Sequence, residues 1–226
     1  MSLRLLVAAV CCSVLFSACS KSSNTPANTA SVMFVNGCIP STALAFNVDA
    51  TVNGTAVPGA TGIAILKTSG YKPVAVGTDS ISFVSSGSVI LGGTLSTTVN
   101  KSYSAFLGGS GYTPVFNLVA DDLTAPSSGN IKIRFANFSP QNLNENCFYG
   151  STKLDSNVSY PVVTQFFEVP AATATILMQD PINPTMFPTN LQNQVFTAGK
   201  IYTVLLTGLY SSTGSSALTY TLINNN

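Results

Sequence analysis

The chain has 226 residues, a formal net charge of +1 and few charged residues, 8 % compared with roughly 25 % in an average soluble domain. Hydrophobic residues make up 46 %, which is enough for a core. The sequence contains no histidine, which excludes Ser-His-Asp and Cys-His catalysis and any imidazole metal site. It also has no run of Lys or Arg that could displace counterions from phosphates, so we expect no nucleic-acid partner.

The beginning of the chain is typical of an export signal. Arg4 is the only charge before an apolar run over Leu5–Phe16, and the small residues Ser17 and Ala18 follow. This is the order of a secretory signal peptide. The apolar run is shorter than the roughly 20 residues that a membrane-spanning helix needs. We therefore predict a signal peptide at residues 1–18 and no integral span in the mature chain.

Cys19 directly follows Phe16-Ser17-Ala18, an order that resembles the lipobox of bacterial lipoproteins. An ordinary signal peptide cut near Ala18 is the alternative. Residues 19–30 are mostly polar and small, so we predict a flexible, lipidated tether. Several acyl chains at Cys19 would hold the protein on a membrane, because each buried CH₂ contributes about 0.8 kcal/mol. The expected location is the cell envelope, at the outer membrane, with the periplasmic and surface faces both left open.

The rest of the chain is a succession of short strand patterns. Runs of β-branched and aromatic residues alternate with Gly, Pro, Asn and Ser, and no segment carries a helical apolar stripe over three turns. The pattern predicts strands at Val32–Val35, Ile81–Val84, Tyr103–Leu107, Val115–Ala120, Ile131–Phe135, Ile201–Leu206 and Leu218–Ile223. It predicts turns at Asn53-Gly54, Pro58-Gly59, Gly92-Gly93 and Ser127–Gly129. Many short strands with regular turns indicate a sandwich or a barrel.

Charged residues in one of these strands indicate which face is buried. Lys132 and Arg134 alternate with the apolar residues of Ile131–Phe135. Strict alternation predicts a strand with one buried face and one solvent face. We therefore expect both charged side chains to be exposed.

The two halves of the sequence are alike. Ser31–Asn36 aligns with Lys132–Asn137, and Pro40 and Pro140 follow these segments. Three further segments have counterparts in the second half: Tyr71–Val74 with Phe166–Val169, Ser80–Phe83 with Thr175–Met178, and Lys101–Gly109 with Lys200–Gly208. A repeat of this length predicts two similar units.

These motifs resemble the bacterial family called domain of unknown function 4397, over about residues 30 to 224. The stretch Ile131–Pro140 and the strand Gly199–Gly208 carry most of the resemblance. The resemblance implies an exported, Bacteroidota-type lipoprotein with a pair of immunoglobulin-like folds, and no established activity. The fold class predicted is thus all-β, with two tandem immunoglobulin-like antiparallel β-sandwich domains. They are expected at residues 31–122 and 131–226, with a linker at 123–130.

The sequence offers few residues for chemistry. Cys38 and Cys147 are predicted either to form a disulfide, which an exported compartment permits, or to be small buried hydrophobic residues. Asp121-Asp122 could contribute to a Ca²⁺ site, but solvation in a linker is the favoured interpretation. We expect no catalytic residue, no cofactor and no metal site. The remaining weak signals are the Ser-x-x-Lys at Ser69–Lys72, the glycine-rich Gly108–Gly111, and the acids Glu145, Asp155, Glu168 and Asp180.

Three functions are compatible with this pattern. The first is a non-enzymatic cell-envelope module for adhesion, scaffolding or partner binding, with an unknown protein or glycan partner. The second is a carbohydrate-binding module of glycan uptake, and the third is a glycoside hydrolase that uses Asp and Glu. Because binding residues are usually found on loops, the candidate loops are Asn36–Ala43, Gly108–Pro114 and Pro181–Asn193.

Overall fold

The protein is an all-β structure, with sheets packed face to face. The structure is a computed structural model and describes residues 28–40, 46–141, 144–182, 184–185, 188, 191–210 and 212–226. In this part of the chain the only helical element is the 3₁₀ turn η1 (Gly214–Ser216). The predicted signal peptide, and the tether up to residue 27 with Cys19, lie outside the described residues, and β1 already begins at Thr29.

The first half of the chain forms two four-stranded sheets. One sheet has the order β4-β1-β7-β8, and the other has the order β3-β2-β5-β6. The strands are β1 (Thr29–Asn36), β2 (Asp49–Val52), β3 (Thr55–Ala56), β4 (Lys67–Ala75), β5 (Gly77–Ser85), β6 (Ser88–Thr97), β7 (Ser102–Ser110) and β8 (Thr113–Asp121). Val32 and Phe34 of β1 pack against Ile81 and Phe83 of β5 in one apolar cluster. We call this pair of sheets the first sandwich.

The second half repeats the arrangement with shorter strands. Its sheets have the orders β12-β9-β17-β18, with β13 also paired to β9, and β11-β10-β15, and β14 pairs with β16. The strands are β9 (Asn130–Asn137), β10 (Glu145–Tyr149), β11 (Thr152–Val158), β12 (Val162–Val163), β13 (Phe167–Pro170), β14 (Thr173–Ala174), β15 (Ile176–Gln179), β16 (Gln194–Val195), β17 (Ile201–Thr207) and β18 (Thr219–Asn224). These strands enclose their own cluster around Phe135, Met178 and Val204. We call this part the second sandwich.

Hydrogen bonds confirm the alignment of the two halves. Asn36 Oδ1 accepts from Cys38 N, and Asn137 Oδ1 accepts from Ser139 N, at 3.3 and 3.2 Å. The amide groups of both asparagines donate to main-chain carbonyls inside their own sandwich. Asn36 therefore has the same role at the end of β1 that Asn137 has at the end of β9.

Most strand pairs are antiparallel, but the central pair of each half is parallel. β1 runs parallel to β7, and β9 runs parallel to β17. Parallel neighbours need a long crossover, which the second sheet of each sandwich supplies. The antiparallel pattern expected from the sequence thus holds except at these two pairs. The structure does not test the expected domain limits, and the immunoglobulin-like class stays a prediction.

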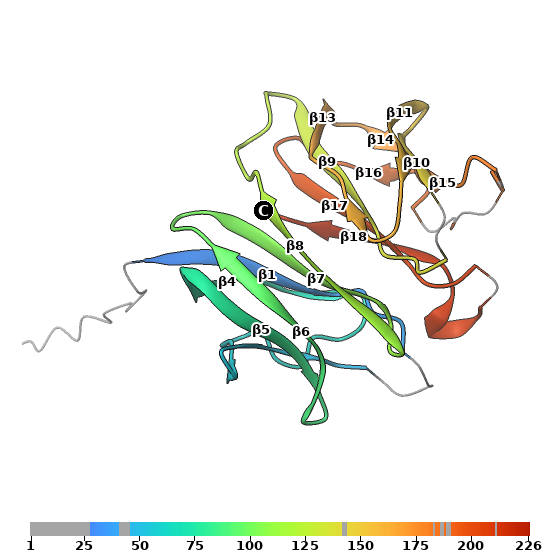
Figure 1. The fold of residues 1–226 in the computed structure, drawn as a ribbon. Coiled ribbons are helices and arrows are strands. Elements are labelled where there is room, and N and C mark those ends of the chain that lie inside the picture. The colour runs from blue at the N-terminus through green and yellow to red at the C-terminus, as the bar shows by residue number, and fades with distance from the viewer. Residues whose placement is uncertain are drawn as a thin grey trace, which may run out of the picture.

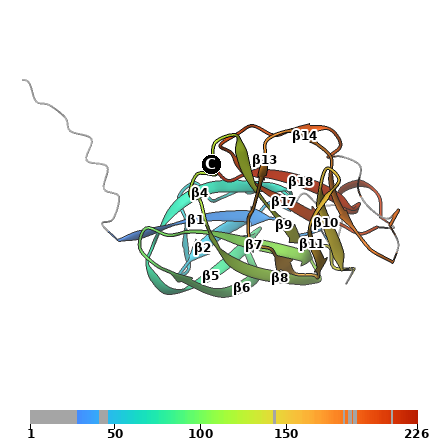
Figure 2. The same cartoon turned by 90° about the horizontal axis from the view of Figure 1, so that it is seen from above.

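The two sandwiches pack against each other through their central sheets. Met33, Val35 and Phe106 of the first sandwich form a third apolar cluster with Phe138 and Leu205 of the second. The rings of Phe106 and Phe138 stack with centroids 5.2 Å apart. Figures 1 and 2 show the blue-to-green and the yellow-to-red halves side by side in both views. Three buried clusters thus lie between four layers of sheet.

This contact corrects the expectation for Ile131–Phe135. Both faces of β9 are buried, because one face covers the second sandwich's own core and the other packs on the first sandwich. Arg134 is 1 % exposed and Lys132 is 8 % exposed, so neither is on a solvent face. The turn expected at Gly92-Gly93 is also wrong. The two glycines lie inside β6, where the ring of Phe116 would be 2.5 Å from a Cβ on Gly93.

We predict that Gly108→Ala weakens the packing between the sandwiches. A Cβ at this position would lie 2.0 Å from Cδ1 of Phe138, and Gly108 has no positive φ, so the cause would be steric alone. Overpacking of this kind typically costs about 1–3 kcal/mol. Urea denaturation measures the loss of unfolding free energy. Gly92→Ala is the matched control, since its Cβ would make only ordinary contacts; equal losses for both variants would contradict the prediction.

Candidate functional site

Four central strands finish at the same end of the molecule. β1 and β7 run parallel, β9 and β17 run parallel, and Thr207 Oγ1 at the end of β17 donates to Gly37 O just after β1, at 2.7 Å. We call this the loop end, and the end at which these strands begin the base. In Figure 1, β1 runs from the left towards the loop end on the right.

The described parts of two loops selected from the sequence lie at the loop end, and the third loop begins there and returns beside the start of β15, where Asn193 N donates to Thr175 Oγ1. Ile39 N donates to Gly109 O and Gly111 N donates to Ile39 O, which joins the first loop to the β7–β8 hairpin. Pro181 follows β15, which finishes beside the start of β10 because Asn146 pairs with Gln179. The structure describes the first loop only to Pro40 and the third only in part. The fold thus brings the described parts of the first two loops and the start of the third to one end.

Exposed apolar side chains gather at the same end. Tyr112 is 77 % exposed on the β7–β8 hairpin, and Ile182 is 84 % exposed after β15. Among the described residues, five of the seven large apolar side chains that are exposed lie at or beside this end: Val89, Tyr112, Val162, Ile182 and Tyr210. The other two, Val99 and Val195, lie towards the base. These side chains stand on separate segments of the chain, so each is a candidate contact for a partner that covers this end.

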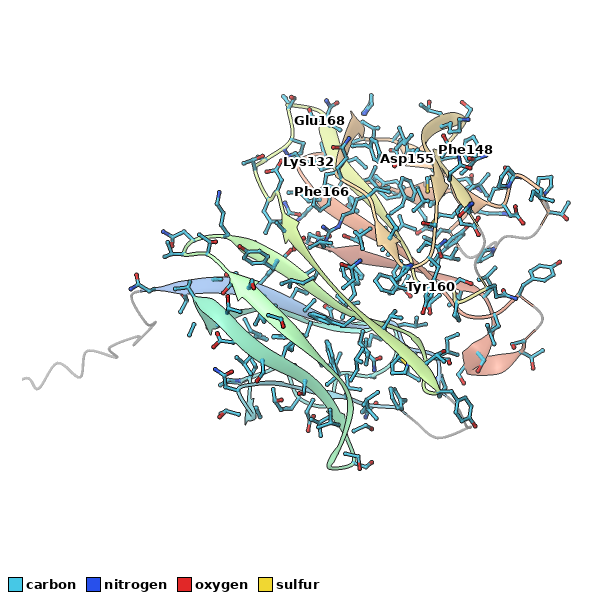
Figure 3. The ribbon with its side chains drawn as sticks, viewed as in Figure 1. Lys132, Phe148, Asp155, Tyr160, Phe166 and Glu168 are labelled. Carbon is cyan, nitrogen blue, oxygen red and sulfur yellow. The ribbon has the colours of Figure 1, made fainter. Side chains whose placement is uncertain are left out.

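Contacts between the sandwiches hold the loop end in one arrangement. Tyr160 of the second sandwich lies between the two halves in Figure 3, and its hydroxyl would be 2.8 Å from a Cβ on Gly109. Gly109 has a φ of 75°, which an L side chain rarely adopts. Only a glycine therefore allows the hairpin to approach both Tyr160 and its own Thr113 O.

A buried ion pair joins the sandwiches towards the base. Arg134 Nη1 of β9 lies 2.7 Å from Asp121 Oδ1 of β8, and both side chains are almost fully buried. Asp121 Oδ1 has no other hydrogen-bond partner among the described residues, so this oxygen depends on the ion pair. The Arg134 guanidinium also lies 4.4 Å from the ring centroid of Phe166. This contact corrects the expectation that Asp121 is a solvated linker residue.

Hydrogen bonds extend the ion pair into a closed ring across the interface. Asp121 Oδ2 accepts from the Tyr71 hydroxyl at 2.5 Å, and the Tyr71 oxygen accepts from Asn225 Nδ2 at 3.2 Å. Thr203 Oγ1 donates to Asn225 Oδ1 and accepts from Arg134 Nε, which closes the ring. Burial and the Asp121 charge both raise the pKa of Tyr71, so it stays a neutral donor.

Lys132 and Asp122 form a second ion pair at the base. Lys132 Nζ lies 2.7 Å from Asp122 Oδ2, and hydrogen bonds from Lys132 and Thr124 lower the pKa of Asp122 to about 2. Asp122 lies on the rim of a depression of about 770 Å³. Tyr103 is the only aromatic residue among the described residues that line this depression; the others are mainly hydroxyl, amide and charged residues.

The four acids selected from the sequence do not form one catalytic group. Glu168 is exposed and accepts from Ser127 N and Asn130 Nδ2 at 2.9 Å, and Figure 3 shows it far from Asp155. Glu145 and Asp180, by contrast, are both buried at the loop end of the second sandwich. Neither lines any of the three described depressions.

The Cys38–Cys147 disulfide is absent from the structure. Both thiols are free and buried, Cys38 in the cluster of the first sandwich and Cys147 in that of the second. Burial raises the pKa of Cys38 to about 12, which keeps the thiol protonated. The two side chains therefore act as small hydrophobic residues, the alternative that the sequence also allowed.

The other weak motifs have structural roles. Ser69 Oγ donates to Gly70 O and accepts from Phe34 N, so Ser69 holds the bulge between β4 and β1. Gly108–Gly111 belongs to the β7–β8 hairpin, as expected. No group of three or more potential metal-binding His, Cys, Asp or Glu side chains occurs within the described ranges. None of the described helices is long and apolar enough to cross a membrane.

These observations define an all-β protein of packed sandwiches that joins its two halves by a buried polar ring and presents its loops at one end. The family described as Domain of unknown function (DUF4397) matches residues 30–144, half of the chain, and the protein belongs to this family. The match covers the first sandwich and β9. No curated protein matches the chain significantly.

We predict that Arg134→Leu strongly destabilises the fold. The substitution leaves the Asp121 carboxylate buried without its counter-charge, which typically costs about 3–5 kcal/mol. Thermal and urea denaturation measure the change. Asp122→Asn removes the charge of the largely exposed partner at the base, where Lys132 keeps its hydrogen bond to Thr124 Oγ1, and should cost clearly less than Arg134→Leu. A small effect of Arg134→Leu, comparable with that of Asp122→Asn, would show that the buried ion pair is dispensable.

Proposed function

We propose that the protein is a non-enzymatic lipoprotein of the cell envelope that binds a partner through its loop end. The proposal is carried by the described loop segments and the exposed apolar residues that share the loop end. A tether attached before Thr29 would join the molecule at the base, since Thr29 O accepts from Asn100 N beside the start of β7. The loop end would then point away from the membrane.

Rigidity supports a binding role rather than a spacer role. Loops on a preformed frame lose little conformational entropy when a partner binds. The buried ring around Arg134 and the stacked Phe106 and Phe138 fix the loops of one sandwich relative to those of the other. A partner could therefore contact both sandwiches at once.

A carbohydrate ligand is the second candidate. The depression at the base has hydroxyl and amide groups from Thr98, Asn100 and Ser102 beside the ring of Tyr103, a combination that suits a neutral sugar. A glycan array with the wild type and Tyr103→Ala distinguishes the candidates. Binding that Tyr103→Ala removes would favour the sugar, and an array without binding would set it aside.

Substitutions of exposed apolar residues test the loop end. We expect the double variant Tyr112→Ser, Ile182→Ser to reduce capture of a specific envelope partner at least 10-fold, because two central apolar contacts are lost. The double variant Val99→Ser, Val195→Ser removes two exposed apolar side chains towards the base, 39 % and 76 % exposed, and should capture the partner normally. Quantitative pull-down from envelope extract is the measurement. Equal capture by both variants would place the interface elsewhere.

The proposed lipid anchor at Cys19 can be tested separately from partner binding. Mass spectrometry of the mature protein should find a lipidated Cys19 at the N-terminus, and Cys19→Ser should move the protein from the membrane fraction to the soluble fraction. An unmodified Cys19 in a membrane-bound wild type would refute the anchor.

A further inference from the structure

Two buried carboxyl groups lie next to each other at the loop end of the second sandwich. Asn146 of β10 pairs with Gln179 of β15, so Glu145 and Asp180 face each other one step further along the two antiparallel strands. Side chains in directly opposite positions have Cβ atoms about 4.5–5.5 Å apart. Glu145 is 2 % exposed and Asp180 is 3 % exposed. Both acids are therefore withdrawn from bulk water.

One oxygen of the buried Glu145 carboxyl group lacks the hydrogen bond that a buried carboxylate normally accepts. Its Oε2 atom has no partner among the described residues. Asp180, in contrast, uses Oδ1 to accept from Ile182 N at 2.9 Å and holds the chain as it leaves β15. A buried carboxylate without a partner is strongly disfavoured unless it carries a proton or meets a positive charge.

The internal repeat shows that the fold does not need an acid at this position. Ala50 pairs with Phe83 in the first sandwich, as Cys147 pairs with Met178 in the second. Two residues before Ala50 stands Val48, which is fully buried and belongs to the apolar cluster. Glu145 thus occupies a core position that the other copy fills with a hydrocarbon side chain.

The surroundings of Glu145 favour its neutral form. Burial, and secondly the charge of Asp180, raise the pKa of Glu145 to about 7. Other titratable groups around this site are Cys147 on β10, whose pKa Asp155 of β11 also raises, and Tyr220 on β18. All of these groups are acids, and no cation contributes to the pKa of Glu145.

We propose that Glu145 and Asp180 form a proton-controlled switch that tightens the loop end of the second sandwich when Glu145 is protonated and loosens it when the proton leaves. In the protonated state one negative charge remains, and Asp180 keeps its hydrogen bond to Ile182 N. After the proton leaves, two buried carboxylates repel each other between β10 and β15. The switch goes beyond partner binding and does not depend on it.

The sign of the effect on stability follows from the raised pKa. Between about pH 4.5 and 7 the folded state holds a proton on Glu145 that the unfolded state has lost, so stability falls as the pH rises through this window. Above about pH 7 both states are deprotonated and the loss is complete. Glu145→Gln keeps the neutral shape and should remove this dependence.

The test compares melting temperatures of the full chain between pH 5 and pH 8. The Tm of Glu145→Gln minus that of the wild type should grow by about 5–10 °C over this range. Glu168→Gln, an exposed glutamate of the same sandwich, is the matched control and should show no such growth. Glu145→Val places the side chain of Val48 at this position and should behave like Glu145→Gln. A difference that stays constant with pH for both Glu145 variants would overturn the switch.

Hydrogen exchange shows which residues lose protection when Glu145 is deprotonated. At pH 8 the wild type should lose protection at Asn146, Gln179 and Ile182 relative to Glu145→Gln, after correction for intrinsic exchange, and at pH 5 the two proteins should be alike. Equal protection at pH 8 would overturn the switch. So would a stabilisation by Ca²⁺ at pH 8 that Glu145→Gln abolishes, because the pair would then be a cation site.

Discussion

The buried contact between Arg134 and Asp121 is the constraint on which the arrangement of the molecule depends. A guanidinium and a carboxylate without water are stable only when each is closely paired and its remaining hydrogen bonds are made. Tyr71, Thr203 and Asn225 make those bonds, and they come from both sandwiches. The two halves therefore cannot separate without exposing an apolar cluster and breaking a charge pair. Such a network fixes how the two sandwiches are placed relative to each other more than it raises the free energy of unfolding.

Much of the fold follows from the sequence, because strands and turns are local. The expected strands from Val32–Val35 to Leu218–Ile223 are present, and Asn36 and Asn137, which the repeat aligns, make the same hydrogen bond. The face of a strand, however, depends on what packs over it. Lys132 and Arg134 alternate like solvent-facing residues, and only the docking of the first sandwich buries them. Nothing local in Asp121-Asp122 distinguishes the buried acid from the exposed one.

The candidate site also combines features that the sequence predicts with features that only the folded chain creates. Loops could be selected from composition, and the parallel central strands then explain why the described parts of the first two loops lie at one end. The pairing of Glu145 with Asp180 could not be found from spacing, since 35 positions separate them and the antiparallel register of β10 and β15 brings them together. The strand pairing of the structure aligns Glu145 with the apolar Val48 of the first sandwich, an equivalence that the sequence alignment of the two halves did not include. Differences between repeats thus point to function, and shared residues such as Asn36 and Asn137 point to folding.

The central claim is that the two sandwiches form one rigid frame for the loop end. Double electron–electron resonance between spin labels at Tyr112→Cys and Tyr210→Cys measures this most directly, because the two positions are exposed on different sandwiches. The native Cys38 and Cys147 are buried and should not react with the label. A single narrow distance distribution is the predicted result. A broad or multimodal distribution in the wild-type background would show that the sandwiches move independently and would contradict the account.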